Sequence, residues 1–292
     1  QIFEKTLQIA QESGISVLNV LLWATGVYGG LASGNAISAQ VCLDGLEKNL
    51  SVHRKHEVTQ FLFLKAGVDF LKGDFSDALE NASLALQNHE EVGRPFLEET
   101  TRSCLAQILI ELDDIETART HLYKSINYAR IFRSPLLEHQ CLLIEAYSWL
   151  KQSDIQEVLI SLYEGLRIAR ENDFLCLNYW WRPHVMAKLF SLALQHGIEV
   201  DYVKSVIRRR HVRAESHECD HWPWPIKIYT LGKFEIHLDD VPLRFQGKTQ
   251  HKPLELLKYL CASGGKSVNQ DRIIDALWPD SMGDAGEQAL RT

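Results

Sequence analysis

Residues 66–86 have the sequence AGVDFLKGDFSDALENASLAL, and the same pattern returns forty residues later at 106–126 and again at 146–166. An earlier copy, shifted by thirty-nine residues, contains Leu31, Gly34, Asn35 and Ala39. The columns that keep their residue type are Ala66, Ala106 and Ala146; Phe70, Ile110 and Leu150; Asp74, Asp114 and Asp154; Phe75, Ile115 and Ile155; Ala78, Ala118 and Val158; and Leu86, Ile126 and Leu166. A fixed period of this length indicates a repeat architecture.

Each copy has the pattern of two helices joined by a short polar turn. Ala78, Ala82 and Leu86 recur every four residues, as one buried helix face should. The Asp column stands where a carboxylate can accept hydrogen bonds from the free amides of the second helix. The sequence therefore predicts a mainly α protein, an α-solenoid of about 40-residue helical-hairpin repeats. Such an array broadly resembles tetratricopeptide-like repeats of longer period.

The ends of the array are expected from where the pattern starts and fades. The stretch Gln1–Ser13 has the face pattern of a second helix, so we expect the chain to begin within the array. Beyond Asp154, the Trp180–Trp181 pair and Pro183 interrupt the pattern, and 198–210 is expected to be a capping helix. These features predict a repeat domain over 1–210 and a linker over 211–225.

Beyond the linker, the pattern changes from helix to strand. The stretch IKIYTLGKFEIHLDDVPLRF at 226–245 alternates apolar and polar residues, with a turn at Asp239–Asp240. A helix is expected over 252–265, and a second from Asn269 to Pro279. A third helix is expected to begin near Asp284 or Ala285.

Three runs in this region resemble a known family: LGKFEIHLDD (231–240), KPLELLKYL (252–260) and DRIIDALWPD (271–280). They are similar to the winged-helix domain of bacterial transcriptional activators related to antibiotic-pathway regulators and response regulators. The whole chain resembles the C-terminal half of large regulators organised like the maltose-operon activator. Those place a nucleotide-binding switch domain first, a helical-repeat sensor next and a DNA-binding domain last. The resemblance implies a small sheet, three helices and a final hairpin wing, with the third helix in the major groove.

The chain departs from that family at its C-terminal end. It holds only Asp284–Thr292 of the recognition helix and no wing, so we expect 226–292 to be a truncated winged-helix domain. Groove readout needs a helix of several turns and flanking phosphate contacts, so this chain is expected to bind promoter DNA weakly or not at all. The candidate DNA-binding residues are Lys248, Lys252, Arg272, Gln288, Arg291 and Thr292.

Composition and charge limit the partners. The chain has 292 residues, of which 46% are hydrophobic and 24% charged, as in ordinary globular proteins. The net charge of −7 lies in 1–225, because 226–292 holds nine basic and nine acidic residues. The acidic part is not expected to touch nucleic acid. Six scattered cysteines, no secretory pattern and no bilayer-length apolar run predict a cytoplasmic protein without membrane partners.

Two enzyme-like motifs have simpler interpretations. The run 217–221 fits H-E-x-x-H, but zinc chemistry needs both histidines on one helix face, and the following Trp-Pro-Trp-Pro breaks a helix. We interpret it as linker, with adventitious metal binding as the alternative. Gly265-Lys266-Ser267 lacks the earlier glycine of a phosphate-binding loop, because Leu260 stands there. No catalytic residue, metal ligand or cofactor is predicted, and the chain is not expected to be an enzyme.

Aromatic residues in the array are candidates for a groove that binds a ligand or partner. They are Trp23, Tyr28, Trp149, Trp180 and Trp181, although aromatics at helical spacing more often pack between repeats. The leading prediction is a signal-responsive bacterial transcription regulator, whose array receives an inducer or protein partner and whose winged helix acts at a promoter. One alternative is a helical-repeat interaction scaffold without DNA binding. The other is an enzyme, for which stoichiometric zinc at His217 would be required.

Overall fold

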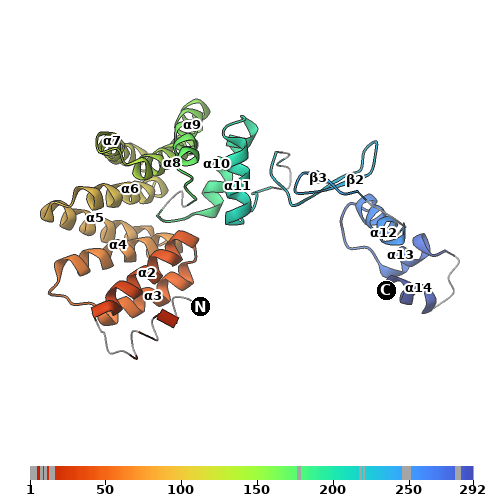
Figure 1. Cartoon of the computed structure of the whole chain (residues 1–292), viewed down its shortest axis with the longest axis horizontal. Coiled ribbons are helices and arrows are strands. Elements are labelled where there is room, and N and C mark those ends of the chain that lie inside the picture. Colours follow the sequence, from red (N-terminus) through yellow and green to blue (C-terminus); the bar gives the residue numbers. More distant parts are fainter. Residues whose placement is uncertain are drawn as a thin grey trace. The chain divides into compact units, whose positions relative to one another are not determined.

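The computed structural model describes residues 5, 6, 9, 12, 17–175, 179–216, 219, 221–244, 251–279 and 284–291. These residues are mainly helical and include one small three-stranded sheet (Figure 1). The chain divides into two compact units, Gln1–Trp222 and Pro223–Thr292. The division falls inside the stretch 211–225 that the sequence predicts to be a linker.

Helices of the first unit pack as consecutive hairpins, which confirms a mainly helical fold built from repeated helix pairs. The pairs α2–α3, α4–α5, α6–α7 and α8–α9 correspond to the four sequence copies, and α10 and α11 follow them. Of the segment 1–13, only Lys5, Thr6, Ile9 and Glu12 are described, and all four are helical. The helices are α2 (Val17–Ser33), α3 (Ala36–Asn49), α4 (Lys55–Lys72), α5 (Phe75–Val92), α6 (Pro95–Glu111), α7 (Ile115–Ile131), α8 (Pro135–Lys151), α9 (Ile155–Glu171), α10 (Pro183–Gln195) and α11 (Val200–Arg210).

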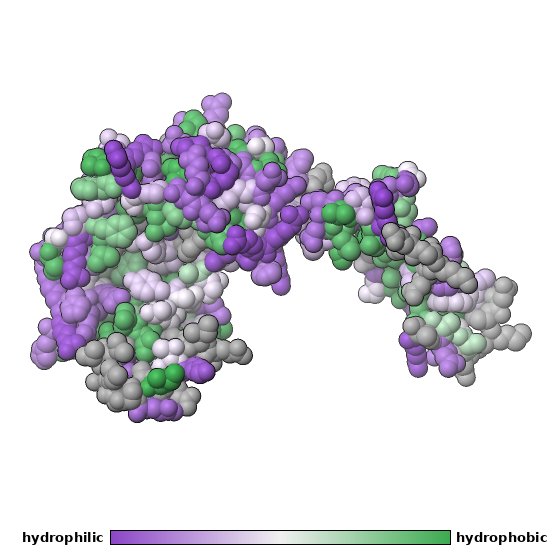
Figure 2. Space-filling model, viewed as in Figure 1, coloured by the Kyte–Doolittle hydropathy of each residue, from purple (hydrophilic) through white to green (hydrophobic). Residues whose placement is uncertain are grey.

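The hairpins stack so that their first helices form one layer. Each of α2, α4, α6 and α8 packs on the next member of this series, and α8 packs on α10. Among the described residues, α3, α5, α7 and α9 make no comparable contacts with one another. The first helices therefore lie closer together, and the stack curves around them. We call the surface of α2, α4, α6 and α8 the inner face. Figure 2 shows hydrophilic side chains over much of the visible surface of this unit, with smaller hydrophobic patches between them.

The positions that repeat every forty residues form the contacts between helices. All members of the column Ala66, Ala106 and Ala146 are fully buried, as are Ala78 and Ala118. Small side chains at these positions let the helices of a hairpin approach closely.

The expected N-caps are present at the start of the second helices. Asp114 accepts a hydrogen bond from the Thr117 amide and Asp154 accepts one from the Glu157 amide, both at 3.3 Å. In the first copy, Asn35 caps α3 in the same way. Asp74 occupies the N-cap position of α5 without a side-chain hydrogen bond. The column therefore marks the helix start in every copy, and the side-chain cap forms in three of the four.

A residue in the left-handed region stands every twenty residues through the regular part of the stack. These residues are Gly73, Gly93, Asp113, Arg133, Ser153 and Asp173, with φ values of 90°, 68°, 62°, 51°, 60° and 52°. Each follows the end of a helix and turns the chain into the next one. Glycine adopts this conformation freely, but an L side chain is strained there by about 1 kcal/mol.

Ser153→Gly is expected to raise the free energy of unfolding by about 0.5–1 kcal/mol, because Ser153 is exposed and gains only relief of backbone strain. Urea unfolding followed by circular dichroism measures the change. Ser153→Ala is the control, since alanine keeps the strain and should give no gain. Equal stability of the two variants would contradict this account of the turn.

The second unit begins with an antiparallel sheet in the order β1-β2-β3. Its strands are β1 (Ile226–Tyr229), β2 (Glu235–Leu238) and β3 (Val241–Pro242). Asp239 and Asp240, both with positive φ, form the two-residue turn between β2 and β3. Three helices follow, α12 (His251–Ala262), α13 (Gln270–Leu277) and α14 (Asp284–Arg291). The expected order of strands and helices is confirmed for the described residues, including the Asn269 cap of α13.

Candidate functional site

The segment Tyr179–Arg182, which we call the strap, lies on the inner face of the first unit. The Trp181 amide donates a hydrogen bond of 3.0 Å to the Leu31 carbonyl of α2, far away in the sequence. The Trp180 side chain is fully buried, with its ring 5.6 Å from that of Phe63 and 5.4 Å from that of Phe70, centroid to centroid. The strap thus covers the middle of α2 and α4 and supplies them with a large apolar side chain.

Glycine at position 67 makes room for the strap. A Cβ added to Gly67 would lie 2.5 Å from Nε1 of Trp180 and 2.9 Å from Cδ1 of Leu31. No side chain fits at those distances. Gly67 lies in helix α4, where the backbone conformation does not require glycine. Glycine is needed because the Trp180 indole approaches this position so closely.

Charged side chains fasten the strap at its far end. Arg182 Nη1 lies 2.7 Å from Glu111 Oε1 on α6, and its guanidinium lies 4.9 Å from the Phe70 ring. Burial opposes ionisation of Glu111, but the hydrogen bond and charge of Arg182, together with Tyr147 and Lys151, outweigh it and lower the pKa of that carboxyl. Arg210 of α11 lies over the Trp181 ring at 4.2 Å and donates to the Ala32 carbonyl. The strap is therefore held by α2, α4, α6 and α11.

Beside the strap lies a cavity of about 330 Å³, bounded by α2, α4, α5 and α6. Its lining residues are Tyr28, His56, Gln60, Phe63, His89, Arg94, Phe96, Leu97, Thr100, Thr101 and Tyr179. A volume of this size is at the lower end of the range for small-molecule sites. It is the candidate site of the first unit.

The walls of the cavity are aromatic with hydrogen-bonding groups between them. The rings of Tyr28 and Phe63 lie 6.4 Å apart. The Thr100 and Thr101 hydroxyls each donate a 2.8 Å hydrogen bond to a carbonyl one turn earlier in α6, so their oxygens remain available as acceptors. Burial raises the pKa of Tyr28, against a hydrogen bond with Gln60, so the phenol stays neutral. Burial, with Arg94 nearby, lowers the pKa of His89.

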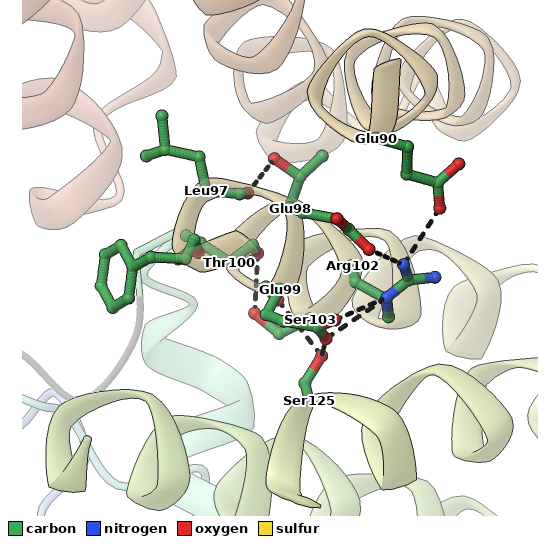
Figure 3. Close-up of polar contacts among 10 residues, drawn as sticks. Glu90, Leu97, Glu98, Glu99, Thr100, Arg102, Ser103 and Ser125 are labelled. Atoms are coloured by element: carbon green, nitrogen blue, oxygen red, sulfur yellow. Dashed lines mark hydrogen bonds and ion pairs between the residues drawn. The ribbon is translucent and has the colours of Figure 1, made fainter. Parts of the chain in front are cut away.

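A buried ion cluster lies next to the cavity on α6 (Figure 3). Arg102 lies 3.0 Å from Glu90 on α5, 2.5 Å from Glu98 and 3.3 Å from Glu99. Ser125 of α7 donates a 2.8 Å hydrogen bond to Glu99. The side chain of Arg102 is only 7% exposed, so one buried guanidinium joins carboxylates of α5 and α6 and, through Ser125, reaches α7.

The structure brings together only some of the aromatic residues proposed as a groove. Tyr28 lines the cavity, and Trp180 and Trp181 form the strap beside it. Trp23 packs over Gly45 of α3. The Arg119 guanidinium lies over the Trp149 ring, 3.1 Å from its centroid. Those two therefore pack between helices. Sequence reasoning missed His56, His89 and Arg94, which stand outside the repeating columns.

The candidate DNA-binding residues of the second unit have different surroundings. Lys252 Nζ donates a 2.6 Å hydrogen bond to the Leu277 carbonyl and lies 5.6 Å from the Trp278 ring, so it joins α12 to the end of α13. Arg272 and Gln288 are exposed, and Arg291 lies 3.4 Å from Glu287 one turn earlier. Lys248 and Thr292 lie outside the described residues.

Two further expectations concern metals and membranes. Within the described ranges, no group of His, Cys, Asp or Glu is arranged to hold a metal ion, and His217, Glu218 and Asp220 of the zinc-like motif lie outside those ranges. No helix in the described part of the chain has the length and apolar character needed to span a bilayer. The cysteines Cys42, Cys104 and Cys141 are buried and free, as expected of small core residues.

Comparison with known proteins does not assign the chain to a family. No family model matches it, and no curated protein matches it. Among solved structures, BtubC (BKLC) from P. vanneervenii is similar, with a TM-score of 0.46 and 16% sequence identity over 72% of this chain and 85% of that one. A likeness at this level carries no argument about fold or function.

Proposed function

We propose that this chain belongs to a signal-responsive bacterial transcription regulator. On this proposal the first unit is an α-solenoid of tetratricopeptide-like repeats that receives a signal, and the second is a winged-helix domain that acts at promoter DNA. The observation that carries the proposal is the order of elements in the second unit. Three short antiparallel strands precede three helices, and the runs LGKFEIHLDD, KPLELLKYL and DRIIDALWPD fall on those elements.

The surface of the second unit is compatible with this function. Arg272 on α13 and Gln288 and Arg291 on α14 are exposed. If α14 enters the major groove, Gln288 and Arg291 would reach base edges or phosphates, and Arg272 would contact the flanking backbone. Lys252 is a weaker candidate, because its ammonium is already engaged by the Leu277 carbonyl.

The first unit has features suited to reception. Stacked hairpins form a curved inner face, and the cavity beside the strap is large enough for a small organic molecule. The concentration of negative charge in 1–225 argues that this unit does not itself contact DNA.

The test is fluorescence anisotropy of a labelled duplex pool titrated with the full-length gene product at several salt concentrations. Affinity should fall steeply as salt rises, because phosphate contacts release counterions. Arg291→Ala should weaken binding at least about fivefold, a loss of ~1 kcal/mol. Lys124→Ala, which removes an exposed charge from α7 of the first unit, is the control and should leave binding unchanged.

The second candidate function is a protein-interaction scaffold without DNA binding. The balance of nine basic and nine acidic residues in 226–292 favours it, since DNA-binding domains usually carry excess positive charge. Absence of duplex binding by the full-length protein at low salt would overturn the regulator proposal and support the scaffold.

A further inference from the structure

The cavity beside the strap is surrounded by groups that can carry positive charge. His56 on α4, His89 on α5 and Arg94 at the start of α6 all line it. None of the lining residues is an aspartate or glutamate. Helices α4, α5 and α6 thus each place a basic side chain at the same cavity, although the chain as a whole has a net charge of −7.

Two of these side chains lack partners in the protein. His89 is 8% exposed, and its ring has no hydrogen-bond partner among the described residues. The Arg94 side chain has no ion pair or hydrogen bond within the same described part, whereas Arg102, Arg130 and Arg182 all have carboxylate partners. The His89 ring is mostly shielded from water, whereas the Arg94 guanidinium is exposed at the mouth of the cavity. Neither group has to give up a protein partner to pair with a ligand that supplies acceptors.

Nearby carboxylates do not oppose an anion in this cavity. Glu98, on the first turns of α6, is paired with Arg102 at 2.5 Å, so its charge is neutralised by that guanidinium (Figure 3). Glu57, beside His56, is paired with Arg54 at 2.7 Å and accepts a hydrogen bond from the Ser51 amide. The hydrogen bond from Arg54 lowers the pKa of Glu57, so this carboxylate stays ionised and neutralised by its own partner.

The N-terminal end of α6 adds to the positive potential. Phe96 and Leu97 lie in its first turn and line the cavity. Free amides and the helix dipole at such an end favour a negatively charged group. This effect supports the side-chain arrangement and does not replace it.

The rest of the lining requires an apolar body. Tyr28, Phe63, Phe96, Leu97 and Tyr179 enclose the remaining space, and four of the five are aromatic. Aromatic walls favour a flat ring, which stacks or meets them edge to face. The volume of about 330 Å³ limits the ligand to a small molecule.

We propose that this cavity binds a small aromatic carboxylic acid in its ionised form, with the carboxylate toward Arg94 and His89 and the ring packed against Tyr28 and Phe63. The ligand's role as the regulator's signal rests on the function proposed above, whereas binding itself does not. Binding of the anion favours the protonated form of His89, so affinity rises as the pH falls. The groups that face His89 are Arg94, which opposes its protonation, and Glu98, which favours it, and His56 shares the cavity.

The experiment is isothermal titration calorimetry on the intact chain with a panel of aromatic acids, each paired with its own carboxamide. The panel contains benzoate, 4-hydroxybenzoate, phenylacetate and indole-3-acetate. We expect at least one acid to bind with a Kd below about 1 mM and its amide to bind at least about tenfold more weakly. Arg94→Met should weaken the acid about tenfold and leave the amide unchanged. Arg133→Met is the control, because Arg133 is an exposed arginine at a turn outside the cavity.

The pH series separates the roles of the charged groups. Affinity for the acid should rise as the pH falls toward the lowered pKa of His89, and His89→Gln should remove that rise. The proposal is overturned if no acid binds below about 1 mM, if acids and amides bind equally, or if Arg94→Met binds like the wild type. Duplex binding takes no part in these measurements, so failure of the DNA-binding proposal and failure of this one are distinguishable.

Discussion

Trp180→Ala is expected to lower the free energy of unfolding of the helical unit by about 3–5 kcal/mol, the cost of removing a large buried aromatic side chain. The side chain is fully buried against Phe63, Phe70 and Gly67, so its loss leaves a cavity that rigid helices cannot fill. Guanidinium unfolding followed by far-ultraviolet circular dichroism measures the change.

Trp149→Ala is the matched control for this variant. Trp149 is half-buried and packs under Arg119, so the same substitution should cost less than about 2 kcal/mol. A second variant, Gly67→Val, keeps Trp180 but places atoms where its indole lies, and it should reproduce most of the loss. If Trp180→Ala costs no more than Trp149→Ala, the strap does not hold the inner face together.

Arg102→Met should be the other severe substitution, with a loss of about 3–5 kcal/mol at neutral pH. It removes the guanidinium that neutralises Glu98 and Glu99 while leaving these carboxylates in place, with side chains only 22% and 11% exposed. An unpaired charge in such a position is costly because water cannot solvate it fully. Thermal and urea unfolding of the purified variant measure the loss.

Rescue distinguishes charge from packing at this cluster. Adding Glu98→Gln and Glu99→Gln to Arg102→Met removes the unpaired charges and should restore a large part of the stability. Arg167→Met is the control, since Arg167 and Glu171 form an exposed pair at 2.9 Å that should contribute less than about 0.5 kcal/mol. A loss at Arg102 as small as at Arg167, or no rescue by the glutamines, would contradict this account.

The repeat columns predicted the hairpins because each column reports a contact between neighbours in the sequence. The Ala66 column marks close helix packing, and the Asp74 column marks the start of each second helix. The strands and helices of the second unit were predictable for the same reason, since turn residues such as Asp239–Asp240 act locally.

The strap and the cavity were not predictable in this way, because they join residues far apart in the sequence. The only sequence signal is a column that fails to repeat, in which Gly67 is followed by Gln107 and then Tyr147. Gly67 meets the indole of Trp180, and Tyr147 lies 5.4 Å from the Arg182 guanidinium, ring centroid to Cζ. The residue type at this position varies because each hairpin meets a different residue of the strap there.

The hydrogen bond from the Trp181 amide to the Leu31 carbonyl also changes how the stack comes apart. In a stack held only by neighbours, the terminal hairpin can open while the others stay folded. Here α2 cannot open without releasing both Trp181 and Arg210, which belong to the last third of the first unit. Fraying from the N-terminal hairpin is therefore coupled to the loss of distant structure. We therefore expect the strap to turn a linear series of helix pairs into one cooperative folding unit, whose backbone amides exchange with solvent together.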